Sequence, residues 1–128
     1  MIGIILASHG TIAKGMFESA KMFFGNDIEQ FTYVSLDSAQ TADELEESLR
    51  QSIHEVNKGD GVIVLADLFG GTPCNRAIQC MEGDTHIISG VNFPILLELL
   101  GARQYNEVDM MTLVQTGQQG ITYVNGLI

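Results

Sequence analysis

The sequence predicts an α/β fold, a three-layer α/β/α sandwich around a mostly parallel, doubly wound sheet. Short apolar runs alternate along the chain with longer amphipathic segments, which is the order expected of strands joined by crossover helices. The apolar runs are continuous and rich in β-branched residues, as is typical of strands buried on both faces. The length of 128 residues suits a single domain, residues 1–128, and a 45% share of apolar residues is enough for a hydrophobic core.

Three continuous apolar runs and one mixed run predict the parallel strands, at residues 2–7, 31–35, 62–66 and 86–89. A fifth, short strand is predicted at residues 121–124, where side chains alternate. Alternation at the end of the chain favours an edge strand that runs antiparallel to its neighbours. A strand in this position can also complete the sheet of a second copy, so we expect a homodimer that exchanges its C-terminal strands.

Amphipathic segments predict the helices, at residues 11–24, 41–56, 72–81, 93–100 and 105–118. The second helix begins with a capping box, because Thr41 stands at the N-cap and Glu44 follows three residues later. Its apolar residues share one face, which predicts a buried stripe of Leu45, Leu49, Ile53 and Val56. Gly25 and Gly120 follow the first and last helices and act as stop signals.

The charge of the chain limits its partners. Acidic residues outnumber basic ones by 16 to 6, so the formal net charge is −10. Nucleic acid and anionic membrane surfaces attract clustered Lys and Arg, and neither is expected as a partner. Two cysteines are too few for a disulfide framework. No apolar run approaches the roughly 18 residues of a membrane span, and the apolar start lacks the basic leader of a signal peptide. These features predict a cytoplasmic protein.

Chemistry is expected where the strands end, because ligands of open α/β sheets bind beyond the carboxyl ends of the strands where strand order reverses. His9 follows the first predicted strand and Asp67 follows the third. A neutral imidazole is a good nucleophile near pH 7. A carboxylate that accepts its other N–H fixes the tautomer and favours the charged ring formed on phosphorylation. His9 is therefore predicted to accept a phosphoryl group and Asp67 to orient it, while a role as mere caps of the sheet stays open.

The loop after the third strand places a helix N-terminus at the same site. Two glycines, Gly70 and Gly71, let the backbone approach a ligand closely. Thr72 is predicted as the N-cap and Pro73 as the first helical residue. Free N–H groups and the helix dipole attract an oxyanion such as phosphate, so Gly71 and Thr72 are predicted to bind it. A plain strand-to-helix turn needs the same residues, and neither a Walker loop nor GxGxxG occurs.

Other chemistries find little support in the sequence. The three histidines, His9, His54 and His86, are dispersed and do not have the spacing of a metal site. Neither a metal nor a cofactor is therefore predicted. Ser8 lacks the G-x-S-x-G pattern of a hydrolase nucleophile, which argues against a hydrolase triad.

Three motifs together resemble the IIA component of mannose-type sugar phosphotransferase systems: IILASHG at residues 4–10, DLFGGTPCN at residues 67–75 and GVNFP at residues 90–94. The resemblance covers the whole chain in order. It implies a mostly parallel sheet with helices on both sides, and a homodimer in which the C-terminal strand pairs with the sheet of the other subunit.

The resemblance also implies a function. A phosphoryl group from the phosphocarrier HPr would be accepted on His9, with Asp67 as its partner and Gly71 and Thr72 beside the phosphate. It would then pass to a IIB component, which phosphorylates sugar entering through the membrane subunits IIC and IID. A serine often stands at the position of Thr72, so the hydroxyl is kept. The sequence does not indicate the sugar, because specificity resides in the membrane subunits.

Three rival hypotheses remain at this point. A response-regulator receiver has an aspartate at the end of its third strand, but it needs acidic residues after the first strand, where Ser8 and His9 stand. The phosphocarrier subunit that serves dihydroxyacetone kinase shares the fold and a histidine near the amino terminus. A binding module could use His9 only to hold an anion.

Overall fold

The computed structural model describes all residues, Met1–Ile128, in two compact units, Met1–Val91 and Asn92–Ile128. The first unit contains the whole sheet, whose strands are β1 (Gly3–His9), β2 (Phe31–Leu36), β3 (Val62–Ala66) and β4 (Thr85–Ser89). The strands are all parallel and lie in the order β2-β1-β3-β4. Ala7 of β1 pairs with Val34 on one side and with Ala66 on the other. The four parallel strands predicted from apolar runs are confirmed.

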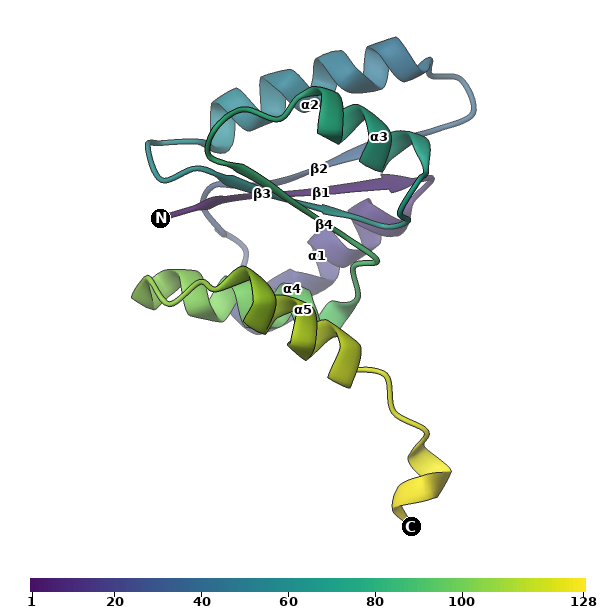
Figure 1. Ribbon diagram of the computed structural model, residues 1–128, viewed down its shortest axis with the longest axis vertical. Coiled ribbons are helices and arrows are strands. Elements are labelled where there is room, and N and C mark those ends of the chain that lie inside the picture. The colour runs from purple at the N-terminus through teal and green to yellow at the C-terminus, as the bar shows by residue number, and fades with distance from the viewer. The chain divides into compact units, whose positions relative to one another are not determined.

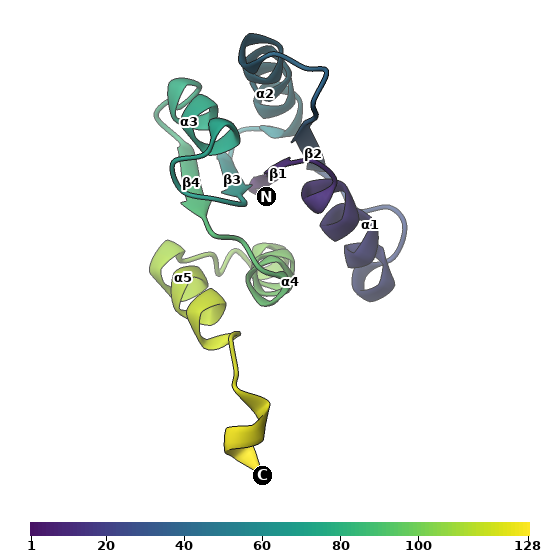
Figure 2. The ribbon, with the colours of Figure 1, turned by 90° about the vertical axis from the view of Figure 1, so that its right-hand side faces the viewer.

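Helices cover both faces of the sheet in the first unit. Helix α1 (Ile12–Phe24) packs on one face, and α2 (Ala42–Val56) and α3 (Thr72–Gln79) pack on the other, as Figures 1 and 2 show. The chain leaves β1 toward one face and β3 toward the opposite face, so the strand order reverses between these two neighbours. The predicted three-layer, doubly wound sandwich is confirmed, and its switch point lies between β1 and β3.

The core of this unit forms between the sheet and the apolar stripe of α2. The four residues of the predicted stripe are all buried: Leu45, Leu49, Ile53 and Val56. They belong to one cluster with Ile5 and Ala7 of β1. The predicted capping box is present, because the Thr41 hydroxyl accepts from the N–H of Glu44 and the Glu44 carboxylate accepts from the N–H of Thr41. On the opposite face, the Phe17 ring of α1 packs against Phe31 and Tyr33 of β2.

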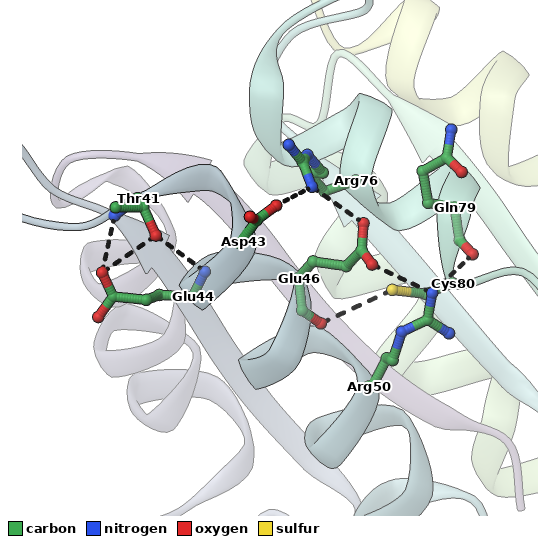
Figure 3. Close-up of polar contacts among 8 residues, drawn as sticks. All are labelled: Thr41, Asp43, Glu44, Glu46, Arg50, Arg76, Gln79 and Cys80. Carbon is green, nitrogen blue, oxygen red and sulfur yellow. Dashed lines mark hydrogen bonds and ion pairs between the residues drawn. The ribbon is translucent and has the colours of Figure 1, made fainter.

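Charged side chains tie α3 to α2 (Figure 3). Arg76 of α3 donates to Asp43 at 2.7 Å and to Glu46 at 3.3 Å. Arg50 of α2 donates to Glu46 at 3.1 Å and to the carbonyl of Gln79, at the end of α3, also at 3.1 Å. The hydrogen bond to Glu46 raises the pKa of the Arg50 guanidinium above its ordinary value. Single surface ion pairs contribute little, but this network restrains the C-terminal half of α3 relative to α2.

The second unit is helical, with α4 (Phe93–Ala102), a 3₁₀ turn η1 (Arg103–Tyr105), α5 (Met110–Gln119) and a 3₁₀ turn η2 (Val124–Leu127). The Asn92 side chain accepts from the N–H of Ile95 as the N-cap of α4 and donates to the carbonyl of Gly117 at 2.7 Å. One side chain therefore links the start of α4 to the end of α5.

Three helices have a boundary that differs from the prediction by two residues or more. The helix expected at 93–100 continues to Ala102. The last helix was expected at 105–118, but α5 begins at Met110 because the Asp109 carboxylate caps the N–H of Thr112. The preceding turn ends at Asn106, whose φ of 56° is left-handed and breaks any helix through it. The helix expected at 72–81 ends at Gln79, where Cys80 follows as the C-cap.

The strand predicted at residues 121–124 is absent from the single chain. Residues 121–123 have no regular secondary structure, and η2 occupies the four residues that follow. A strand needs a neighbouring strand to pair its N–H and C=O groups, and the sheet of this chain contains only β1 to β4. The antiparallel C-terminal strand and its exchange in a dimer therefore stay predictions about an assembly of two chains.

Candidate functional site

His9 and Asp67 meet at the switch point of the sheet. His9 is the last residue of β1, and Asp67 directly follows the last residue of the neighbouring strand β3. Oδ2 of Asp67 lies 2.9 Å from Nδ1 of the His9 ring and accepts a hydrogen bond from the backbone N–H of His9 at 3.0 Å. The expectation that these two residues face one another is confirmed.

The contact with Asp67 distinguishes the two ring nitrogens of His9. An ionised carboxylate can only accept hydrogen bonds, so Nδ1 carries the proton in the neutral ring and Nε2 keeps its lone pair. The Asp67 side chain is 9% exposed, whereas that of His9 is 44% exposed. The pair therefore combines a buried carboxylate with a partly accessible imidazole ring.

The ring of His9 lies directly against Gly71. A Cβ atom at position 71 would stand 2.7 Å from Cε1 and 3.4 Å from Nε2 of the ring, so any side chain there would displace the imidazole. The preceding residue, Gly70, has a φ of 84°, a left-handed conformation that favours glycine. Glycine at position 70 is thus explained by its backbone conformation, and glycine at position 71 by the close approach of the ring. This approach places Nε2 next to the start of α3.

The N-terminus of α3 is placed as predicted, but its cap is a different residue. Gly71 is the N-cap, Thr72 and Pro73 are the first two helical residues, and no side chain caps the helix. The prediction that Thr72 is the N-cap is therefore wrong, because Gly71 already has the extended backbone of a cap, with ψ of 162°. Without a capping side chain, the N–H groups of the first turn can bind an oxyanion beside the ring.

Ser8 also contacts His9, and sequence reasoning missed this. It was considered only as a hydrolase nucleophile, yet its hydroxyl is buried and hydrogen-bonds the carbonyl of His9. A hydroxyl residue a few positions before a helix start is a weak signal, because many such residues simply face solvent.

The other histidines lie away from this site. His54 lines a cavity of about 380 Å³ with Arg50 and Cys80, at the end of the sheet where β3 and β4 begin. Burial raises the pKa of the Cys80 thiol. His86 lies in β4, three residues before its end, with its side chain exposed. No three His, Cys, Asp or Glu side chains are grouped so that they would hold a metal ion. None of the helices combines the length and the apolar character that a bilayer crossing requires.

Residues 3–115 match the EIIA-man family, described as PTS system fructose IIA component. The chain belongs to this family. The matched range includes every site residue predicted above, and it extends from the start of β1 into α5. The resemblance found in the sequence motifs is confirmed.

Curated members of EIIA-man align over most of the chain. The PTS system fructose-specific EIIA component of Bacillus subtilis (strain 168) is 34% identical over 109 residues, which cover 82% of this chain and 73% of that protein. The PTS system mannose-specific EIIAB component of Escherichia coli (strain K12) is 29% identical over 126 residues, or 94% of this chain. The chain spans only 38% of the length of that second relative.

A solved structure agrees with the EIIA-man fold. The PTS IIA protein associated with the fucose utilization operon from Streptococcus pneumoniae has a TM-score of 0.87 and 29% sequence identity, and the match covers 98% of this chain and 94% of that one. Membership in EIIA-man identifies the chain as a component of a sugar phosphotransferase system and does not favour the dihydroxyacetone kinase alternative.

We predict that Asp67→Asn releases the His9 ring from a single tautomer. The substitution keeps the shape of the side chain but removes its charge, and the amide can donate to Nδ1 as well as accept from it. The share of the neutral ring protonated on Nδ1 should fall, as measured from the ¹⁵N chemical shifts of both ring nitrogens. Asp60→Asn is the control, because that carboxylate pairs with the amino group of Met1 instead. Ring shifts that match the wild type in Asp67→Asn would contradict the assignment.

Proposed function

We propose that this chain is a cytoplasmic phosphocarrier that accepts a phosphoryl group from phospho-HPr on Nε2 of His9 and passes it to a IIB component during sugar uptake. The membrane subunits IIC and IID take part only indirectly, through IIB. The observation that carries the proposal is the double contact of Asp67 with His9, which leaves Nε2 free beside the N-terminus of α3. Family membership supports the system to which the carrier belongs.

The chemistry is an in-line transfer between two nitrogens. The lone pair of His9 Nε2 attacks the phosphorus of the phosphohistidine on HPr, and the P–N bond to the donor breaks as the new P–N bond forms. The His9 ring becomes cationic because Nδ1 keeps its proton, and the Asp67 carboxylate stabilises this charge. The second transfer repeats these steps in reverse order, with a nucleophilic side chain of IIB as the acceptor.

The first turn of α3 supplies donors for the phosphoryl oxygens in this proposal. Gly71 leaves room for the phosphoryl group on Nε2. The N–H groups near Thr72 lie at the N-terminus of α3, which is the positive end of the helix dipole. The Thr72 hydroxyl adds one further donor. These groups stabilise the equatorial oxygens in the transition state without a metal or a cofactor.

We predict that the modified residue is His9 and that its modification is an N-linked phosphoryl group. Incubation with phosphoenolpyruvate, enzyme I and HPr should label the wild type once per chain, and His9→Ala should abolish the label. The label should be lost in acid, because a P–N bond is acid-labile. His54→Ala is the matched control, since that histidine lies in a separate cavity. Mass spectrometry maps the site, and a label that persists in His9→Ala would overturn the proposal.

The proposed carrier is a homodimer that exchanges its C-terminal segments. The end of the chain exposes apolar side chains, among them Ile121 at 81% and Tyr123 at 79%. Strand β4 is one of the two outer strands of the sheet, so one of its edges has no neighbouring strand in this chain. Beside it lies an apolar cavity of about 290 Å³ whose lining includes Ile78, Met81 and Ile87. A segment of a second copy at this edge would pair its backbone and cover exposed apolar surface on both chains.

We predict that removal of residues 121–128 yields monomers or aggregates. The truncation leaves β1 to β4 and all five α-helices intact, so the fold should persist while the exposed edge of β4 loses its cover. Light scattering on the purified protein measures the mass. Thr122→Ala in the full-length chain serves as a control that keeps the segment. A truncated chain that remains a well-behaved dimer would argue against the exchange.

The surface around His9 suits a brief contact with a partner protein. Leu68 and Phe69, directly after Asp67, are 58% and 80% exposed, and Ile12 at the start of α1 is 52% exposed. Small apolar patches with charged surroundings are typical of transient complexes. The net charge of −10 favours a basic partner surface, and long-range attraction raises the rate of association more than the affinity.

We predict that transfer from phospho-HPr to His9 slows as salt is added. At subsaturating protein, the rate should fall between about 0.01 and 0.15 M ionic strength, where the Debye length shrinks from about 30 to 8 Å. Rapid-quench measurements at several salt concentrations give the slope. The rate at saturating donor is the internal control and should change less, because it does not depend on encounter. A rate that stays flat or rises at subsaturating protein would show that the acidic surface does not steer the donor.

A further inference from the structure

Ser8 uses one buried hydroxyl to make two hydrogen bonds. The residue is 1% exposed and precedes His9 in β1. Its Oγ accepts from the N–H of Ala13 at 2.7 Å and donates to the carbonyl of His9 at 3.0 Å. Thr11, at the N-cap of α1, makes no side-chain cap of its own. The hydroxyl of Ser8 therefore satisfies a helix N–H that the residue at the cap leaves unbound.

These bonds complete a set of restraints on the backbone of His9. Asp67 binds its N–H at 3.0 Å, and Ser8 binds its C=O at 3.0 Å. The next residue, Gly10, has a φ of 55° and donates its N–H to the carbonyl of Leu36 at 2.8 Å. The chain thus turns sharply after His9 and is held on both sides of the turn. Both polar backbone groups of the reacting residue are bound by side chains rather than by a neighbouring strand.

Besides this hold on the backbone, the reacting ring is confined by Asp67 at Nδ1 and by Gly71 beside Cε1. Its side chain is 44% exposed, so its outer face has no packing, and one ring nitrogen must stay free for chemistry. In-line transfer needs Nε2 aligned with the phosphorus and the leaving nitrogen, and a displacement of about 1 Å can cost about a hundredfold in rate. A change at the carbonyl of His9 would rotate the Cα–Cβ direction and move Nε2 away from the start of α3.

We infer that Ser8 is a positioning residue, which holds His9 through its carbonyl so that Nε2 faces the N-terminus of α3. The inference rests on the proposed function for its kinetic consequence, but its effect on the ring does not. The hydroxyl also couples the site to α1, because Ala13 is buried and its N–H has Ser8 as its acceptor. Ser8 takes no part in the bonds that form and break.

The test compares Ser8→Ala, Ser8→Thr and Asn57→Ala. Ser8→Thr keeps the hydroxyl. Asn57→Ala is the matched control for lost stability, because its side chain accepts two backbone N–H groups, of Gly59 and Gly61, at the opposite end of the strands from His9. Single-turnover transfer from phospho-HPr at saturating donor should fall at least about tenfold in Ser8→Ala, recover in Ser8→Thr and stay near wild type in Asn57→Ala. Ser8→Cys, of similar size with a weaker donor, replaces Ser8→Ala if that variant does not fold.

A second readout needs no donor protein. The ¹⁵N shifts of the His9 ring should move toward those of a mixture of tautomers in Ser8→Ala, because a displaced ring loses the hydrogen-bond geometry between Nδ1 and Asp67. The same shifts should stay unchanged in Asn57→Ala. Wild-type ring shifts together with a wild-type rate in Ser8→Ala would overturn the inference. Equal losses of rate in Ser8→Ala and Asn57→Ala would reduce Ser8 to a structural cap. If the wild type itself takes no label on His9, the proposed function fails, while the ring shifts still decide the role of Ser8.

Discussion

One oxygen atom, Oδ2 of Asp67, holds His9 at both its backbone N–H and its ring, and the rest of the site follows from this double contact. The contact requires β1 and β3 to be neighbours in the sheet, so that the last residue of one strand meets the first residue after the other. It also determines which ring nitrogen is free. An exposed histidine without such an anchor would sample several ring orientations. Its Nε2 would then have no fixed position relative to the N-terminus of α3.

The scaffold around this contact serves to place α3. The helix begins at Gly71, where the absence of a side chain lets the imidazole approach, and its far end is tied to α2 by Arg50 and Arg76. The network is on the surface and is not a large source of stability. Its effect is geometric, because the oxyanion donors proposed at the start of α3 must stay aligned with the His9 ring, which belongs to β1. Family membership and this geometry both support the proposed phosphoryl transfer. Together they support it more specifically than either does alone.

Sequence patterns predicted the sheet and its layers well because those features depend on local chemistry. Continuous apolar runs have to be buried on both faces, and the capping box and apolar stripe of the helix from Thr41 arise from residues within a few positions of one another. The error at the start of α3 was local too. Thr72 was assigned as the N-cap because its side chain suits that position, but the backbone of Gly71 had already taken it. The segment 121–124 has the alternation of a strand and no neighbour in its own chain with which to pair.

The sequence by itself determined which residues are proposed to carry the chemistry: a histidine and an aspartate after two buried strands, and a glycine-rich turn into a helix. Only the tertiary structure decided how they meet, because residues 58 positions apart come together through strand order rather than through any local pattern. That order made Nδ1 the anchored nitrogen and Nε2 the free one. The tertiary structure also turned Ser8 inward, where its hydroxyl donates to the carbonyl of His9 and accepts from the N–H of Ala13. The sequence does not predict this, because a serine in a strand does not show which helix start it will contact.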